Sequence, residues 1–111
     1  MKETYIVSDN REYYIENIKS KLPLDVILCQ LSEELSEAAQ AALKMVRIIG
    51  GINPTIISAE KARKELISEI ADVNACIRCI DWKEYPISIM SSEITRKIKR
   101  WSDRLDGLTD K

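Results

Sequence analysis

Apolar residues recur at helical spacing in two long segments of this chain. From Pro23 to Ile49, and again from Ser58 to Trp82, they fall three or four residues apart. A period of 3.6 residues predicts two long amphipathic helices, each with an apolar stripe and a polar face. The stripes are Ile27, Leu28, Leu31, Leu35, Ala38, Ala42 and Val46 in the first helix, and Ala62, Leu66, Ile70, Val73, Ile77 and Ile80 in the second.

Two shorter helices are predicted on either side of this pair. The first covers about residues 9–20, where Asp9 and Glu12 have the spacing of a helix-capping pair. The last starts at Pro86, a residue suited to the first helical position, and stops near Gly107. Ser58 is expected to cap the second long helix.

The two long helices are joined by the stretch "GGINPT" at 50–55, whose glycines and proline stop both patterns. A loop this short makes the two helices antiparallel neighbours. Since no segment alternates as a strand does, the sequence predicts an all-α fold, an antiparallel bundle of about four helices in one domain spanning 1–111. The two short helices cannot cover both long stripes, so we expect at least a dimer.

Composition narrows the classes of function. The 17 Lys and Arg residues nearly balance the 18 Asp and Glu residues, so no nucleic-acid partner is expected. No apolar run reaches about 18 residues, and the first ten residues lack the apolar stretch typical of a signal peptide. We therefore expect a cytoplasmic protein without a membrane partner. Cys76 and Cys79 lie within a helical pattern without histidine, which favours packed thiols over zinc. Without histidine, chemistry must use carboxylates, lysine, tyrosine or a metal ion.

Acidic residues crowd the first long helix. On a helical wheel, Glu34 falls roughly 60° and Glu37 roughly 120° to one side of Leu31, at the border of the apolar stripe. Glu33 points instead to the solvated face. Like charges at this spacing repel one another, so the cluster costs stability unless solvent or a cation relieves it.

The second long helix repeats the arrangement. Glu69 and Asp72 fall at the same two offsets from Leu66, in the same rotational sense. Four carboxylates at two facing borders would form the oxygen-only ligand set that Mg²⁺ or Mn²⁺ prefers. The alternative is that these acids lie on ordinary solvated faces and pair with nearby cations, namely Lys44, Lys61, Arg63 or Lys64.

The segments "EELSEAAQAALK" and "ISEIADV" carry an E-x-x-E and an E-x-x-D in that order. In this the chain resembles the all-α nucleoside triphosphate pyrophosphohydrolases of the MazG-like superfamily. The spacer "RIIGGINPT" looks like that of compact, phage-type members, and "RKIKRWSDRL" is similar to their basic C-terminal segment. The resemblance covers about residues 24–105.

This resemblance implies a Mg²⁺-dependent enzyme, with Mn²⁺ as a substitute, that hydrolyses a nucleoside triphosphate to the monophosphate and pyrophosphate, in a role such as nucleotide-pool sanitation. Glu34, Glu37, Glu69 and Asp72 would bind the metal, and Glu34 or Glu37 would serve as the general base. The family also implies a homo-oligomer, a dimer or a tetramer, with an oligomeric four-helix-bundle core. The alternative is a non-catalytic helical oligomerisation module of the same fold.

Candidate substrate-binding residues lie on both long helices and on the last predicted helix. Lys44 follows Glu37 by two helical turns, so its ammonium could meet a bound phosphate. Asn74 could read a base edge or face solvent, and Trp82 and Trp101 could stack on a base, although we expect them to pack in the core.

The remaining candidates for substrate binding are basic residues on the last predicted helix. They match the family's basic segment and share one side of the helix, at positions Lys97, Arg100 and Arg104. A triphosphate needs positive charge beyond that of the metal, and arginine suits phosphate oxygens. Salt bridges within this helix are the alternative, with Glu93, Asp103 or Asp106 as partners.

Overall fold

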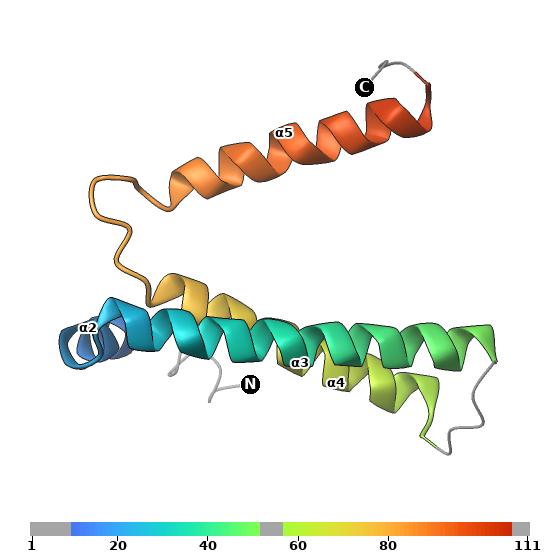
Figure 1. Ribbon diagram of the computed structural model, residues 1–111, viewed down its shortest axis with the longest axis horizontal. Coiled ribbons are helices and arrows are strands. Elements are labelled where there is room, and N and C mark those ends of the chain that lie inside the picture. The colour runs from blue at the N-terminus through green and yellow to red at the C-terminus, as the bar shows by residue number, and fades with distance from the viewer. Residues whose placement is uncertain (1–9, 52–56, 108–111) are drawn as a thin grey trace. The chain divides into compact units, whose positions relative to one another are not determined.

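The computed structural model describes residues 10–51 and 57–107, which form four α-helices and no strand (Figure 1). The predicted all-α class is confirmed. The helices are α2 (Arg11–Lys21), α3 (Leu24–Gly50), α4 (Ala59–Arg78) and α5 (Ser88–Leu105). The chain divides into two compact units, Met1–Asp81 and Trp82–Lys111, which we describe separately. The single domain predicted from the sequence stays a prediction.

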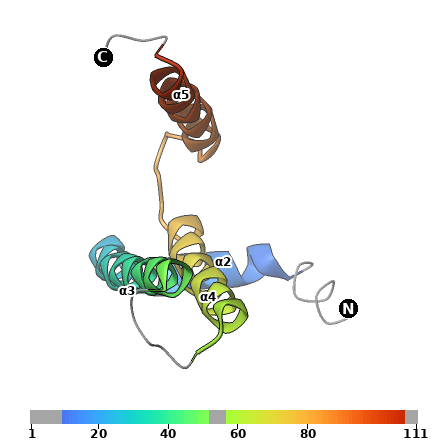
Figure 2. The ribbon, with the colours of Figure 1, turned by 90° about the vertical axis from the view of Figure 1, so that its right-hand side faces the viewer.

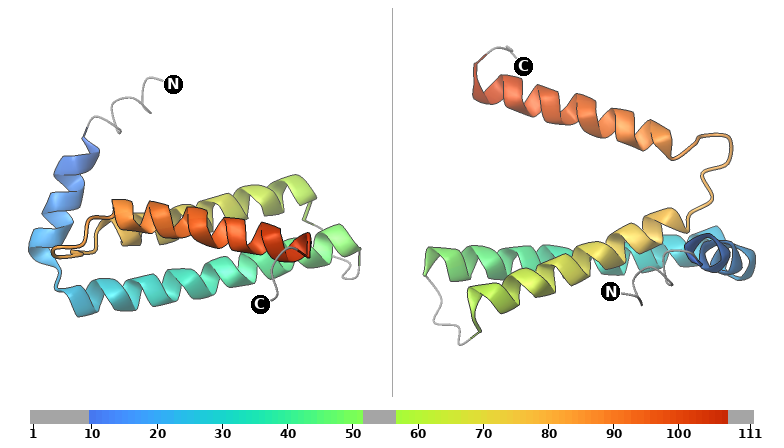
Figure 3. Two further views of the ribbon diagram at one scale, coloured as in Figure 1. Left: turned by 90° about the horizontal axis from the view of Figure 1, so that it is seen from above. Right: turned by 180° about the vertical axis from the view of Figure 1, so that it is seen from behind.

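Helices α3 and α4 lie side by side and antiparallel, as predicted (Figures 1 and 3). Helix α3 ends at Gly51, which has φ 65° and donates its N–H to the carbonyls of Arg47 and Ile48. Glycine adopts this left-handed conformation without a steric penalty. At the start of α4, Ser58 Oγ accepts the N–H of Lys61 at 3.1 Å, which confirms the predicted cap. The loop residues 52–56 lie outside the described residues.

Helix α2 runs across the end of this pair where α3 begins and α4 ends (Figures 2 and 3). The core of this unit lies at the junction. It consists of Ile27, Cys79 and Ile80, with Ile15 and Leu31 packed against them. Burial of Cys79 agrees with the expectation of a packed thiol, and all three cysteines are free.

Helix α4 ends at Arg78, four residues before the predicted end at Trp82. Its last turn tightens at Cys79, whose N–H donates to the carbonyls of Cys76 and Ile77. At Lys83 the backbone has φ 62°, a left-handed conformation that an α-helix cannot contain. The apolar pattern continues past the helix because the residues after it are still buried in the core.

The ends of the two shorter helices also differ slightly from the prediction. Helix α5 begins at Ser88, two residues after Pro86, and stops just before Gly107, which has φ 73°. Helix α2 is preceded by Asn10, whose side chain makes no capping hydrogen bond. The predicted partner of Glu12 in the capping pair, Asp9, lies outside the described residues.

The second unit is built around α5, and none of the residues in this helix is buried. Four large apolar side chains recur three or four residues apart along one stripe and are exposed: Ile94, Ile98, Trp101 and Leu105. An apolar stripe at this spacing is the surface through which an amphipathic helix packs against another element. Within the described residues, no helix has both the length and the apolar character needed to cross a lipid bilayer.

Helix α3 carries a wider apolar surface than α4 covers. Ile27 and Met45 are buried, whereas Leu35 is 50% exposed and Val46 is 59% exposed. On a helical wheel the buried arc is centred roughly 50° from Leu31, toward the side that carries the glutamates. The predicted stripe is therefore half covered, because one neighbouring helix shields only part of so broad an arc.

Candidate functional site

Packing of α3 against α4 brings three of the four predicted metal ligands together. One carboxylate oxygen from each of Glu34, Glu37 and Glu69 lies within 4.8 Å of the other two. The fourth, Asp72, is exposed and is not one of this trio, although it lies close enough for its charge to affect Glu69. We call Glu34, Glu37 and Glu69 the acidic trio.

Two members of the acidic trio, Glu34 and Glu69, lie deeper in the interface than the sequence suggested. Glu34 was expected at the border of the apolar stripe, but the shifted buried arc of α3 places it inside that arc. As a result, Oε1 of Glu34 and Oε1 of Glu69 are shielded from solvent and have no hydrogen-bond partner among the described residues. Shielded carboxylate oxygens without a partner are costly, since they lose hydration and gain nothing in return.

The charges of neighbouring carboxylates add to the cost of shielding these oxygens from solvent. Burial raises the pKa of Glu69, and the charges of Glu37, Asp72 and Glu34 raise it further, as does a hydrogen bond with Glu37. Crowded carboxyl groups respond in this way because each ionised group disfavours ionisation of the next. A divalent cation would relieve the repulsion and supply the shielded oxygens with a partner. The residues present therefore fit a hard cation such as Mg²⁺ or Mn²⁺.

Two neighbours of the acidic trio were not anticipated from the sequence. Gln30 Nε2 donates to Glu34 Oε2 at 2.7 Å, which holds that carboxylate in place. The sequence could have indicated this hydrogen bond, since residues four apart face each other on a helix. The other neighbour is Cys76, whose pKa is raised by burial and then by the charges of Glu34, Cys79 and Asp72. Its position, seven residues after Glu69, places it on the same face of α4.

The predicted phosphate contact, Lys44, is engaged elsewhere in the structure. Its Nζ donates to Glu65 Oε1 at 3.1 Å and ties α3 to α4. Asn74 is exposed, and its Nδ2 donates to the carbonyl of Ile70 at 3.1 Å. The predicted roles of Lys44 and Asn74 in substrate binding stay predictions.

On α5, three predicted phosphate-binding residues are exposed: Lys97, Arg100 and Arg104. Two of the three acids considered as their partners, Glu93 and Asp103, pair with other cations. Arg96 Nη2 lies 2.7 Å from Glu93 Oε1, and Lys99 Nζ lies 2.7 Å from Asp103 Oδ2. Within the part of the chain that the structure describes, the three predicted residues form no ion pair.

Both tryptophans are exposed, Trp82 at 37% and Trp101 at 66%. The core-filling role expected for them is therefore not found in the described chain, whose buried core contains no aromatic residue. No family model, no curated protein and no solved structure was found to match this chain. The interpretation of the site thus depends on its motifs and its geometry.

Proposed function

We propose that this chain is a Mg²⁺-dependent nucleoside triphosphate pyrophosphohydrolase of the MazG-like superfamily. The observation that carries the proposal is the convergence of Glu34, Glu37 and Glu69 across the α3–α4 interface, with two shielded oxygens that lack a partner. These three acids belong to the two motifs, E-x-x-E and E-x-x-D, on which the family resemblance depends. Asp72, one turn after Glu69, completes the second motif.

The acids have separate roles in this proposal. Glu34, Glu37, Glu69 and Asp72 would hold the cation. Bound there, Mg²⁺ would neutralise charge on the phosphate oxygens and lower the pKa of a water molecule. Gln30 keeps Glu34 oriented through its hydrogen bond, and Glu37 is the more exposed member of its pair. Either carboxylate can accept the proton of the attacking water, as general-base catalysis requires.

Uncovered apolar surface supports the homo-oligomer that the proposal includes. Leu35 and Val46 on α3 and Ile67 and Ile70 on α4 are exposed although they are large and apolar. Large apolar side chains exposed on neighbouring helices are typical of an interface between proteins. A dimer or tetramer with a four-helix-bundle core would bury it.

The test is a panel of ribonucleoside and deoxyribonucleoside triphosphates, assayed for pyrophosphate release with Mg²⁺ and with EDTA. We expect Mg²⁺-dependent release from at least one nucleotide. Glu37→Gln and Asp72→Asn should abolish it while preserving the helical circular-dichroism spectrum, because each removes a charge without changing shape. Glu33→Gln, on the solvated face, is the matched control. Wild-type turnover in both site variants at saturating Mg²⁺ would rule out the assignment.

The second candidate is a non-catalytic helical oligomerisation module. The bare apolar stripe of α5 and the exposed apolar surface of α3 favour it, since both call for a partner. The two candidates differ in their response to metal. A bound cation stabilises a folded protein, so Mg²⁺ should raise the melting temperature of the enzyme and leave that of the module unchanged.

A further inference from the structure

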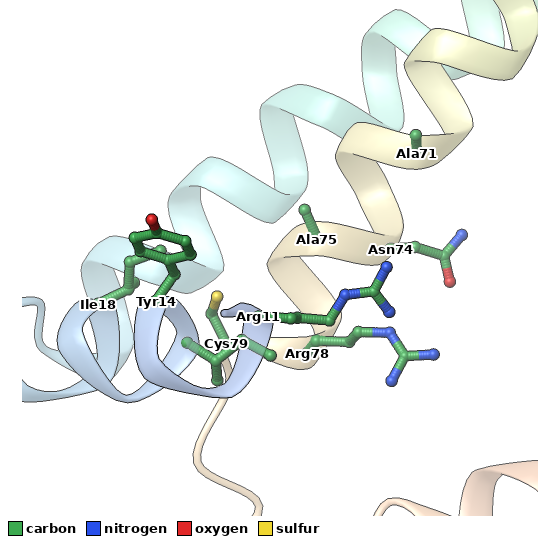
Figure 4. Close-up of a pocket in the computed structure, with 9 residues that line it drawn as sticks. Arg11, Tyr14, Ile18, Ala71, Asn74, Ala75, Arg78 and Cys79 are labelled. Carbon is green, nitrogen blue, oxygen red and sulfur yellow. The ribbon is translucent and has the colours of Figure 1, made fainter. Parts of the chain in front are cut away.

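A cavity of about 450 Å³ lies between α2 and α4 (Figure 4). On α4 its lining residues follow the spacing of a single helical face. A helical wheel places this face roughly 140° around α4 from Glu69 and Asp72, so the cavity is separate from the acidic trio. The α4 residues that line it are Ala71, Asn74, Ala75 and Arg78.

Apolar side chains make up much of the wall. Helix α2 contributes Tyr14, Ile15 and Ile18, while α4 contributes small residues such as Ala71 and Ala75. The alanines explain why a hollow forms here, because their short side chains cannot fill the space between two crossing helices. The volume falls within the range of about 300 to 1,000 Å³ that is typical of small-molecule sites.

Positive charge dominates the polar part of the lining. Arg11 and Arg78 both line the cavity, no acidic residue does so, and neither arginine has an ion pair within the described residues. Figure 4 shows both guanidinium groups and the Asn74 amide extending to the same side. Two positive charges that line one cavity favour an anion there. Their fork geometry suits the oxygens of a phosphate or carboxylate.

We propose that this cavity binds a small organic anion, an oxyanion group carried on an aromatic body. Arg11 and Arg78 would hold the oxyanion, and the aromatic body would lie against Tyr14 and the aliphatic wall. Asn74 adds a hydrogen-bond donor, since its Nδ2 gives one N–H to the carbonyl of Ile70 and its second N–H is left for the oxyanion. This proposal does not depend on the proposed function.

The experiment compares two dyes that have the same aromatic rings. Anilinonaphthalene sulfonate carries an anionic group, whereas N-phenylnaphthylamine lacks it. Both are titrated by fluorescence into the full chain in EDTA, so that the acidic trio takes no part. We expect the sulfonate to bind with one-to-one stoichiometry and at least about tenfold more tightly than the neutral dye, a difference of about 1.4 kcal/mol.

Variants test whether the dyes bind in this cavity. Replacing both cavity arginines, Arg11→Gln with Arg78→Gln, should remove the preference for the anionic dye. Arg63→Gln, which removes an exposed arginine of α4 outside the cavity, is the matched control and should retain it. Ala75→Leu keeps both arginines but fills the hollow, so it should weaken both dyes. Equal affinity of the two dyes for the wild-type chain would overturn the proposal, as would an unchanged preference in the double variant.

Two further measurements separate the possible occupants. Displacement of the anionic dye by phenyl phosphate or by benzoate would support the proposal and would show which oxyanion is preferred. Failure of both at millimolar concentration would contradict it. If the affinity for the dye falls as protein concentration rises, a second copy covers the cavity, and the surface is an interface instead of a ligand site.

Discussion

Lys44 and Glu65 form an ion pair of 3.1 Å between α3 and α4, with each side chain more than one-third exposed. The pair links the two helices that carry the acidic trio. Solvent screens charges with this degree of exposure, so the pair contributes little to stability by itself. Lys44 was expected to bind phosphate. Its ion pair with Glu65 and a contact with phosphate are two roles that mutations can separate.

Alanine replacements at both positions test the roles of Lys44. A double-mutant cycle of Lys44→Ala and Glu65→Ala should give a coupling energy below about 1 kcal/mol in urea unfolding. If Lys44 also contacts phosphate, Lys44→Ala should raise KM for the nucleotide severalfold, whereas Glu65→Ala should not. Equal KM values in the two variants would confine Lys44 to a structural role.

Glu69 should make stability depend on pH in a particular direction. Its pKa is raised by burial and by Glu37, Asp72 and Glu34, so the folded state holds the proton more tightly than the unfolded state. The stability gained from this proton is complete at low pH and is lost as pH rises through the folded-state pKa. In EDTA, Glu69→Gln should therefore gain stability relative to wild type as pH rises above the ordinary range of a glutamate carboxyl. Thermal unfolding at a series of pH values measures this difference.

Glu33→Gln supplies the control for that experiment, because Glu33 is an exposed acid on the same helix. Its stability curve should run parallel to that of wild type across the same pH series. A Glu69→Gln curve that is also parallel would mean that burial and the neighbouring carboxylates do not raise the pKa of Glu69.

The exposed apolar face of α3 should mediate association. Leu35→Lys places a charge in this face, and since Leu35 is half exposed, the fold of one chain should tolerate it. We expect the dissociation constant to rise at least about tenfold, a cost of about 1.4 kcal/mol, in sedimentation equilibrium. Ser36→Lys, on an exposed polar neighbour, should leave association unchanged. A wild-type chain that sediments only as a 12.7 kDa species at micromolar concentration would contradict the oligomer.

The unpaired cations of α5 should bind the triphosphate. We expect Lys97→Ala and Arg100→Ala each to raise KM for the nucleotide roughly tenfold, about 1.4 kcal/mol, with a smaller effect on the Mg²⁺ requirement. Arg96→Ala and Lys99→Ala are matched controls, because these residues already pair with acids of the same helix. Unchanged KM and kcat in Lys97→Ala and Arg100→Ala would mean that α5 does not bind the nucleotide and has only a structural role.

Much of the fold follows from local sequence signals. The spacing of apolar residues predicted both long helices, and Ser58 and Gly51 define ends that depend only on hydrogen bonds to nearby residues. The matched phase of the two acid motifs predicted that Glu34, Glu37, Glu69 and Asp72 would meet across the helix pair, and the first three do so. These features were accessible because helical geometry is regular, so positions on one helix follow from residue numbers alone.

Tertiary packing decided which part of each helix is covered. Periodicity shows that α3 has a broad apolar arc, but only the packing of the neighbouring segments on α3 buries Ile27 and Met45 while leaving Leu35 exposed. The same packing shields an oxygen of Glu34 from solvent and leaves Asp72 outside the acidic trio.

The remaining contacts join residues that are far apart in sequence. Lys44 meets Glu65, and Arg11 on α2 lines the same cavity as Arg78 on α4. No local pattern specifies such pairs, because each depends on how two helices cross, and that angle is set by the side chains of both helices together. The sequence therefore determined the helices and the facing acids, and the packing determined their burial, their partners and the cavity between α2 and α4.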